Sequence, residues 1–520
     1  MILETLTTIG KYFLYFCVAY IIYVVYIMIL KPFLFWKSYQ KYSNVYCDTS
    51  FTPILGDLWY NLDNVKKGKV HYNHLIEKAN EFKDYDLRVV NEGTMPMMFI
   101  VSQKAMSEFV ELQPVKVDKA HVKMGLPKCA PQALANVRTN KLSQDRRKLM
   151  IGLLDLTRAA HYIPCILKNA ENALKGLEDG KVQRLNHAID MCTFGIISNV
   201  FFGDDVDNIA NKLREYYNPD GTMEMIPVRE MFVRLPRAFM LQQFNPLTTA
   251  LPFLNTYNLV NPYKRDDDNL RRCRVALEEV LDETKDEKSI YHQIKNVEWY
   301  DKETLFAELT AFTVAAFESS AQSTTTVLYN LAKKPECLKK VRAELEENGF
   351  KIGADFGKIC TMDSIQDLEY LGMVIKEAWR MDTPFAETFP YQAYEDIEIC
   401  GVPVKKGTWI GVDLVTSHFD ENCWLDPMEF VPERFDTESD FYNDGMKSGK
   451  KRNVYSTRTF SHGARMCPGQ TLATLQIKII LAYLLTHMDY EVDKEFLERA
   501  GVGFGFGSEF DLMAKINKKV

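Results

Sequence analysis

The chain has 520 residues, of which 47% are hydrophobic and 12% aromatic, so it has ample apolar side chains to bury one large core. Its formal net charge of -7 at pH 7 gives no overall basic field that would hold a polyanion, which excludes nucleic acid as an expected partner. The 11 cysteines are scattered singly without a CxxC pair, a pattern typical of free thiols in a reducing compartment.

The first segment of the chain predicts a membrane anchor. The run from Tyr12 to Leu30 holds no charge and, at roughly 19 residues, has the length that crosses a bilayer core. Lysines and aromatic residues follow it, as expected for a positive cytosolic flank and an interfacial belt. We therefore expect an anchor over residues 1–31, with its transmembrane part at about 12–30, and a cytosolic body. A cleaved signal peptide is the alternative, but no small-x-small cleavage site follows the run.

The rest of the chain predicts one domain behind a short linker. Residues 32–50 mix polar and aromatic side chains around one proline, which suits a linker on the membrane surface, and residues 51–520 show no repeat or change in composition that would divide the catalytic domain. Strand-like runs are few, and the helix-like runs are long: 166–177, 270–284, 301–334, 338–347 and 470–487. We expect a mainly α fold with small β-sheets, preceded by a single transmembrane helix.

The segment 301–334 predicts an unusually long helix. Asp301 can cap its first turn, and two lysines followed by Pro335 end it. Its middle, residues 312–320, is mostly small or apolar and then abruptly polar. Such a patch lets a flat group approach the helix closely.

The segment that carries the chemistry is a tight, glycine-rich loop around one cysteine, just before the last long helix: Phe460-Ser461-His462-Gly463-Ala464-Arg465-Met466-Cys467-Pro468-Gly469. Backbone N–H groups of such a loop, and of the helix N-terminus after it, stabilise a thiolate and lower its pKa, while the neighbouring Arg465 can pair with a haem carboxylate. A lone cysteine is usually only a small buried hydrophobe. The match of five positions to a known family, given next, reverses this expectation, because thiolate ligation of haem iron accounts for the phenylalanine, glycines, arginine and cysteine together.

At these residues the chain resembles the cytochrome P-450 superfamily, whose haem loop has Phe, Gly, Arg, Cys and Gly at the same spacings. The resemblance implies that Cys467 is the axial ligand of the iron of haem b (iron protoporphyrin IX) and that Arg465 contacts a haem propionate. Phe460, Gly463 and Gly469 are then the remaining cofactor-binding residues of the loop. The resemblance also implies the cytochrome P-450 fold, with O2 activated on the opposite face of the haem.

Two further matches lie upstream of the loop. Glu377 and Arg380 stand at i and i+3 on one helix, a spacing that on its own usually means a surface salt bridge, and Arg434 lies between them and the loop. The resemblance implies that the three form a buried structural network that braces the haem-side core without contacting substrate. The match covers roughly the last 220 residues well.

The first half of the chain resembles the family mainly through its anchor and through Arg146-Arg147 on a predicted helix. The family often has a tryptophan four residues before the first arginine, and both contact a propionate. The resemblance therefore makes Arg146 the candidate propionate ligand, with Leu142 in place of the tryptophan, whereas a solvated arginine pair is the alternative. Tyr391 stands where many relatives have another propionate-binding arginine, so carboxylate pairing is expected to be unusual.

The oxygen-side helix departs most from the family pattern, because Ala-Gly-x-Glu-Thr appears here as Ala315-Ala316-Phe317-Glu318-Ser319. Oxygen cleavage needs protons, and a carboxylate beside a hydroxyl can relay them. This chemistry makes Glu318 and Ser319 the catalytic candidates, with Ser320 offering a second hydroxyl. In the alternative, Glu318 is a buried, satisfied carboxylate and the serines only bond back to the i-4 carbonyl.

Electrons are expected from another protein, because the glycine-rich stretch 501–507 lacks the GxGxxG spacing of a dinucleotide site. The resemblance implies NADPH-cytochrome P-450 reductase, with cytochrome b5 as a second donor, at the endoplasmic reticulum membrane. The anchor and the family's apolar pocket favour a lipophilic small-molecule substrate, with Phe504 and Phe506 as candidate contacts. The basic residues before the haem loop are candidate contacts for an acidic donor, or else a solvated basic loop: Lys447, Lys450, Lys451, Arg452 and Arg458.

The main functional hypothesis is a monooxygenase that inserts one oxygen atom of O2 into an apolar C–H or C=C bond, with the Cys467 thiolate donating electron density. A peroxide-rearranging isomerase or dehydratase is the alternative within the enzymes. Such relatives need no reductase and often alter the oxygen-side helix, as Ala316 and Ser319 do here, although Glu318 argues against this class. A non-catalytic haem-binding protein is the alternative of another class, and the lack of HExxH and GxSxG motifs excludes the zinc and serine hydrolases that they mark.

Overall fold

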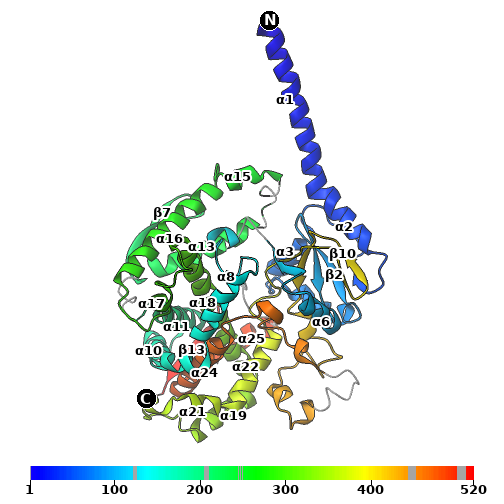
Figure 1. Ribbon diagram of the computed structural model, residues 1–520. Coiled ribbons are helices and arrows are strands. Elements are labelled where there is room, and N and C mark those ends of the chain that lie inside the picture. The colour runs from blue at the N-terminus through cyan, green and yellow to red at the C-terminus, as the bar shows by residue number, and fades with distance from the viewer. Residues whose placement is uncertain are drawn as a thin grey trace.

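One long helix stands out from the body of the protein and carries the N-terminus away from it, while the C-terminus lies at the other end of the body (Figure 1). The structure is a computed structural model that describes residues 2–120, 126–203, 210–243, 245, 248, 250–442, 452–500 and 511–519. The body is mainly α-helical with small sheets, which confirms the fold class expected from the sequence.

Helices make up most of the body. The longer ones are α1 (Ile2–Val25), α2 (Lys31–Tyr39), α3 (Leu58–Lys66), α6 (Gln103–Leu112), α8 (Lys141–Leu153), α10 (Ile163–Gly176), α11 (Leu185–Phe202), α13 (Val228–Gln243), α16 (Tyr263–Glu283), α18 (Lys302–Lys333), α19 (Pro335–Glu347), α22 (Glu369–Met381) and α24 (Gln470–His487). The shorter ones are α4 (Asn73–Glu77), α5 (Ala79–Phe82), α7 (Leu126–Cys129), α9 (Leu156–Ala159), α15 (Pro252–Thr256), α17 (Ile290–Ile294), α20 (Phe356–Ile359), α21 (Met362–Gln366) and α25 (Lys494–Ala500). The expected long helices are all present, although α16 and α19 begin earlier than the apolar periodicity predicted.

The strands of the described residues form small sheets. The largest has the strand order β1 (Val45–Tyr46), β2 (Leu87–Glu92), β3 (Met95–Ile100), β11 (Trp409–Val412), β8 (Tyr391–Ala393), β4 (Val117–Lys119). One smaller sheet has the strand order β12 (Met488–Val492), β13 (Met513–Lys518), β5 (Val182–Arg184). The other two pair β10 (Val402–Val404) with β9 (Ile397–Ile399) and β6 (Leu213–Tyr217) with β7 (Met223–Pro227). The largest sheet joins segments from both halves of the chain and has its own hydrophobic core cluster.

The N-terminal helix runs further into the body than the sequence predicted. A π-helical turn, Tyr26–Leu30, joins α1 to α2, and the span Thr8–Tyr39 is the one helix in the described parts of the chain that is long and apolar enough to cross a membrane. None of its most apolar stretch is buried. At the other end, Tyr39 is buried and its hydroxyl donates to the Pro403 carbonyl over 3.1 Å. Because β1 also belongs to the largest sheet, residues 39–46 contact the body, and the division into a linker over residues 32–50 and a catalytic domain over residues 51–520 stays a prediction.

The long helix α18 lies in the main hydrophobic core and packs against α11, α22 and α24. The Asp301 side chain accepts a hydrogen bond from the Thr304 N–H over 2.8 Å, as its capping position predicts. Lys334 forms the break between α18 and α19 because a residue directly before a proline is disfavoured in a helix. The bounds read from the sequence for this helix are therefore confirmed to within a residue at each end.

Candidate functional site

The cysteine loop is a tight turn with a backbone hydrogen bond across it. The Cys467 N–H donates to the Phe460 carbonyl over 3.0 Å. Gly463 has a φ of +82°, and a Cβ placed on it would lie 2.8 Å from Gln113 Oε1, so both the backbone conformation and the close neighbour favour glycine there. At Gly469 an added Cβ would meet Cys467 Sγ at an ordinary contact distance of 3.9 Å. A side chain would therefore be tolerated at Gly469, whose observed contact with the thiol is the hydrogen bond from its backbone N–H.

The Cys467 thiol has accessible surface although many protein atoms surround it. Burial raises the pKa of this thiol, whereas a hydrogen bond from the Gly469 N–H and the charge of Arg147 lower it. These two groups favour the thiolate, which is the form that ligates a metal. No group of three or more His, Cys, Asp or Glu side chains that could hold a bare metal ion occurs in the described residues. The donor set thus suits a metal that arrives inside a larger cofactor and needs one axial ligand.

Aromatic and polar contacts tie the loop to the helices behind it. The ring centroid of Phe460 lies 5.0 Å from that of Trp379 of α22, in an edge-to-face arrangement at 89°. The Trp379 indole N–H donates to Ser323 Oγ of α18 over 2.8 Å. Gln476 of α24, the helix that begins directly after the loop, donates to Ser320 Oγ of α18. The loop and the oxygen-side helix are therefore linked at two places.

Glu377, Arg380 and Arg434 come together as a network, and each is at most 1% exposed. Arg380 donates to both oxygens of the Glu377 carboxylate, over 2.8 and 2.9 Å, and Arg434 Nε donates to Oε1 over 3.1 Å. The remaining donors of Arg380 bind the carbonyls of His418, Pro427 and Glu429. Such two-pronged, fully satisfied pairing is what a buried charge needs. The network fixes the chain that leads toward the cysteine loop.

The structure does not bring Arg146 to the cysteine loop. Arg146 of α8 is buried and donates to Glu308 Oε1 of α18 over 2.7 Å. Its neighbour Arg147 instead donates to the carbonyl of the residue directly before Cys467. Because an α-helix has 3.6 residues per turn, adjacent side chains point about 100° apart, and only one of the two can face the loop. Arg147, and not Arg146, therefore lies against the cysteine loop, and Leu142, in place of the tryptophan, is exposed.

Arg147, Arg465 and Lys119 form a cationic cluster beside the loop. Lys119 of β4 lies opposite Tyr391 of β8 in the sheet register, with its Nζ 4.0 Å from the centre of the tyrosine ring. Burial, and then repulsion from Arg465, lowers the pKa of Lys119 to about 7 and also lowers the pKa of Arg147. The negative charge of Asp118 opposes these effects and raises the pKa of Lys119. Buried like charges are unfavourable without a counter-ion, so the cluster fits a cofactor that carries carboxylates, as haem does.

Arg465 also holds the loop to the segment between α7 and α8. Its guanidinium donates to the carbonyls of Leu134 and Val137 over 2.6 and 2.9 Å and to Thr139 Oγ1 over 3.1 Å. These contacts leave the Nε–H and one Nη1–H of this side chain for other acceptors. The sequence analysis did not predict that Lys119 or Arg147 lies near the cysteine loop. The pair Arg146-Arg147 was the one sequence feature that pointed to either of them.

The oxygen-side residues lie on an accessible part of α18. Most of this helix is buried, but Ala315 is exposed and Glu318 and Ser319 are partly exposed. The Ser319 hydroxyl donates to the Ala315 carbonyl over 2.7 Å, which is the i-4 pattern. The Ser320 hydroxyl is buried and accepts a hydrogen bond from Gln476. Of the two serines, only Ser319 lies on the accessible surface beside Glu318.

Most of the other predicted contacts lie outside the described residues: the glycine-rich stretch 501–507 with Phe504 and Phe506, and Lys447, Lys450 and Lys451. Arg458 is described and is 0% exposed, and its guanidinium donates to backbone carbonyls of β3, of the loop after it and of Asp413. Arg452 is partly buried and lies over the rings of Trp424 and Tyr442. Burial thus corrects the prediction that Arg458 meets an electron donor.

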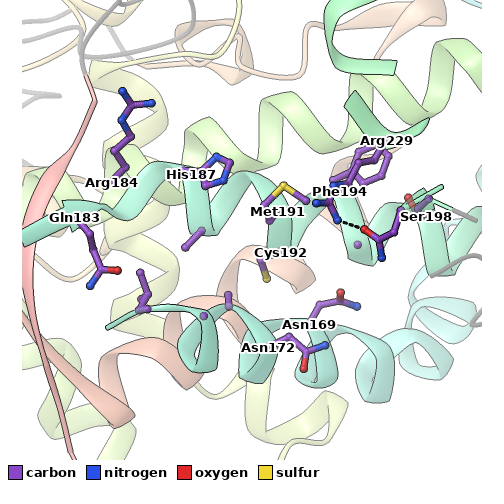
Figure 2. Close-up of a pocket in the computed structure, with 17 residues that line it drawn as sticks. Asn169, Asn172, Gln183, Arg184, His187, Met191, Cys192, Phe194, Ser198 and Arg229 are labelled. Carbon is purple, nitrogen blue, oxygen red and sulfur yellow. Dashed lines mark hydrogen bonds between the residues drawn. The ribbon is translucent and has the colours of Figure 1, made fainter. Parts of the chain in front are cut away.

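A pocket of about 590 Å³ lies elsewhere, between α10 and α11. Figure 2 shows His187, Met191 and Phe194 of α11 above Asn169 and Asn172 of α10. None of the predicted site residues is among the described residues that line this pocket. It is therefore separate from the cysteine loop.

Residues 57–499 match the cytochrome P450 family. Cytochrome P450 4d1 of Drosophila simulans is 25% identical over 375 residues, which are 67% of this chain and 69% of that protein. Cytochrome P450 3A12 of Canis lupus familiaris is 24% identical over 338 residues, 62% of each chain. Cytochrome P450 71B1 of Thlaspi arvense is 31% identical over 179 residues, which are 34% of this chain and 33% of that protein. The chain thus belongs to the cytochrome P450 family of haem-thiolate monooxygenases.

Proposed function

We propose that the chain is a membrane-anchored monooxygenase that inserts one atom of O2 into a lipophilic small organic substrate, with Cys467 as the axial ligand of haem b. The observation that carries the proposal is the surroundings of the Cys467 thiol. Burial raises the pKa of this thiol, and against that effect a backbone N–H from Gly469 and a guanidinium from Arg147 favour its thiolate form. The cationic cluster next to it suits the propionates of the same cofactor.

The haem, when bound, supplies the iron chemistry that activates O2. The residues of the chain would bind the haem and hold it in place. Cys467 would ligate the iron as a thiolate and donate electron density, and Lys119, Arg147 and Arg465 would hold the haem carboxylates. Glu377, with its two arginines, keeps the approach to the loop rigid, because moving a buried charge away from its partners is costly.

Proton delivery is assigned to Glu318 and Ser319 on the accessible part of α18. A carboxylate and a hydroxyl one residue apart can pass a proton through water. The Ser319 hydroxyl, which binds the Ala315 carbonyl over 2.7 Å, can turn away by a rotation about χ1. This hydrogen bond, together with Ala316, favours a peroxide-rearranging enzyme as the second candidate function, since that reaction needs no proton relay.

The proposed electron donor is NADPH-cytochrome P-450 reductase, with cytochrome b5 as an auxiliary donor, at the endoplasmic reticulum membrane. The span Thr8–Tyr39 supports the anchor, and its positive flank supports a cytosolic body. An anchored enzyme meets substrates that partition into lipid, which supports a lipophilic substrate. The two candidate functions differ in their need for a reductase.

The first test is the absorption spectrum of the dithionite-reduced protein with CO, for the wild type, Cys467→Ala and a matched control, Cys47→Ala. Cys47 is a partly exposed free thiol far from the loop in sequence. We expect a red-shifted Soret band in the wild type and in Cys47→Ala and its loss in Cys467→Ala, because thiolate ligation causes the shift. A band that survives Cys467→Ala would refute the proposal. Turnover with NADPH and reductase then supports the monooxygenase, and turnover of a lipid hydroperoxide alone supports the second candidate.

A further inference from the structure

A buried carboxylate on α18 contacts the segment that precedes α8. Glu308 is 0% exposed. Its Oε1 accepts from Arg146 over 2.7 Å and from the Tyr300 hydroxyl over 3.3 Å, and its Oε2 accepts from the backbone N–H of Leu134 over 2.7 Å. Burial raises the pKa of Glu308, while Arg146 and the Leu134 N–H lower it. The charge of Glu308 is therefore tolerated only as long as these partners stay in place.

The same backbone segment is also held from the opposite direction. The Leu134 carbonyl accepts from Arg465 over 2.6 Å, while its N–H is bound to Glu308. Arg146 supports the segment as well, through the Gln132 carbonyl at 2.7 Å. Because the two groups of Leu134 are separated only by its Cα, a shift of the N–H also shifts the carbonyl that orients Arg465.

We propose that Glu308 is a positioning residue for the cysteine loop, an inference that rests on the proposed function. Its carboxylate fixes Leu134, Leu134 orients the guanidinium of Arg465, and Arg465 sits two residues before Cys467 in the loop. Glu308 is also ten residues before Glu318 on α18, about 15 Å along the helix. One charge thus sets the position of the thiolate loop relative to the oxygen-side helix without touching substrate or cofactor.

The test compares full-length, haem-loaded Glu308→Gln with the wild type, because glutamine keeps the size of the side chain and removes its charge. Outer-shell groups that orient a ligand typically change metal affinity by roughly 10- to 100-fold, and we expect haem to dissociate faster by that order. We also expect a smaller share of the bound haem to give the red-shifted Soret band with CO. A residue that only stabilises the fold would lower Tm and leave the spectrum of the bound haem unchanged.

The matched control is Glu303→Gln on the same helix. The Glu303 side chain is 66% exposed and pairs with Arg274 on the surface, so this variant removes an equal charge with no contact to Leu134. We expect its haem dissociation and its spectrum to equal those of the wild type. Arg465→Lys combined with Glu308→Gln should speed haem loss by less than the product of the two single effects, because both act on one segment.

Wild-type haem dissociation and an unchanged spectrum in Glu308→Gln would overturn the proposal, whatever the change in Tm. If this variant does not fold, Tyr300→Phe replaces it with the same readouts, since it removes only the 3.3 Å hydrogen bond to Glu308. Unchanged haem dissociation in Tyr300→Phe would then count equally against the proposal. A wild type that lacks the red-shifted band would instead refute the proposed function, so the two failures are distinguishable.

Discussion

Arg146 and Arg147 are neighbours in the sequence but have different surroundings. Arg146 is buried against Glu308, and Arg147 contacts the backbone directly before Cys467. We expect Arg147→Gln to weaken haem binding roughly 10- to 100-fold, the usual effect of removing an outer-shell group, because the variant removes one of the charges that faces the cofactor carboxylates. The measurement is the haem dissociation rate of the purified protein.

The control for this prediction is Lys148→Gln, which removes a positive charge from an exposed position on the same helix. Haem should dissociate from this variant at the wild-type rate, because its charge is screened by solvent. Equal haem loss from Arg147→Gln and Lys148→Gln would contradict the assignment of Arg147 to the cationic cluster. The comparison therefore separates a local contact from a general effect of charge.

Residue roles were predictable where one short segment contains all the groups that act together. The loop from Phe460 to Gly469 has this property, so Cys467 and Arg465 were proposed as cofactor-binding residues from the resemblance of this one segment to the family. Lys119 was not, because its position depends on the pairing of β4 with β8, more than 270 residues later in the chain. Arg147 was missed by one residue, because the sequence does not specify which side of α8 faces the loop.

At the scale of helices and strands, Asp382 ties three elements together at the end of α22. Its carboxylate accepts from the Tyr72 hydroxyl before α4 over 2.5 Å and from Thr326 Oγ1 of α18 over 2.9 Å. Burial raises the pKa of Asp382 to about 6, although both hydroxyls lower it. The folded protein therefore holds a proton at Asp382 between pH values of about 4 and 6, where the unfolded chain has lost it.

The stabilisation from this bound proton is complete below a pH of about 4 and is lost as the pH rises through about 6, and it is worth about 3 kcal/mol. Asp382→Asn has no such proton, so we expect its Tm to rise relative to that of the wild type as the pH goes from about 4 to about 7. The measurement is Tm across this range. Thr326→Val removes one donor to the carboxylate and should move the transition to higher pH. Parallel Tm curves for wild type and Asp382→Asn would contradict the prediction.

Elements with local signals were predicted better than elements with distant partners. The helix α18 was predicted to within a residue because Asp301 and Pro335 mark its ends, and α24 because it follows the glycine at the end of the loop. The largest sheet was expected only as a small β component. Its strands come from residues 45–119 and 391–412, and no local pattern specifies pairing between segments that far apart.

At the scale of the whole molecule, the body meets the projecting helix at a second place besides α2. The Tyr20 hydroxyl of α1 donates to the Ala250 carbonyl over 2.7 Å. Ala250 directly precedes the α15 segment, residues 251–260, in which Phe253, Tyr257 and Leu259 are 43%, 70% and 55% exposed. In Figure 1, α15 lies at the end of the body from which α1 projects. Tyr20 is ten residues before Leu30, about 15 Å along the helix axis, so a bilayer that contains α1 also reaches the α15 segment.

We therefore expect Tyr257→Trp, in the full-length protein inserted into vesicles, to be quenched by lipids with brominated acyl chains. The control is Ile352→Trp. Ile352 is 42% exposed and lies five residues after the end of α19, a helix at the other end of the body (Figure 1). Its added fluorescence should not be quenched, because no apolar surface holds it at the bilayer. The 6 native tryptophans make the difference from the wild type the relevant signal. Equal quenching at the two positions would mean that the anchor alone holds the protein on the membrane, with its body free to turn.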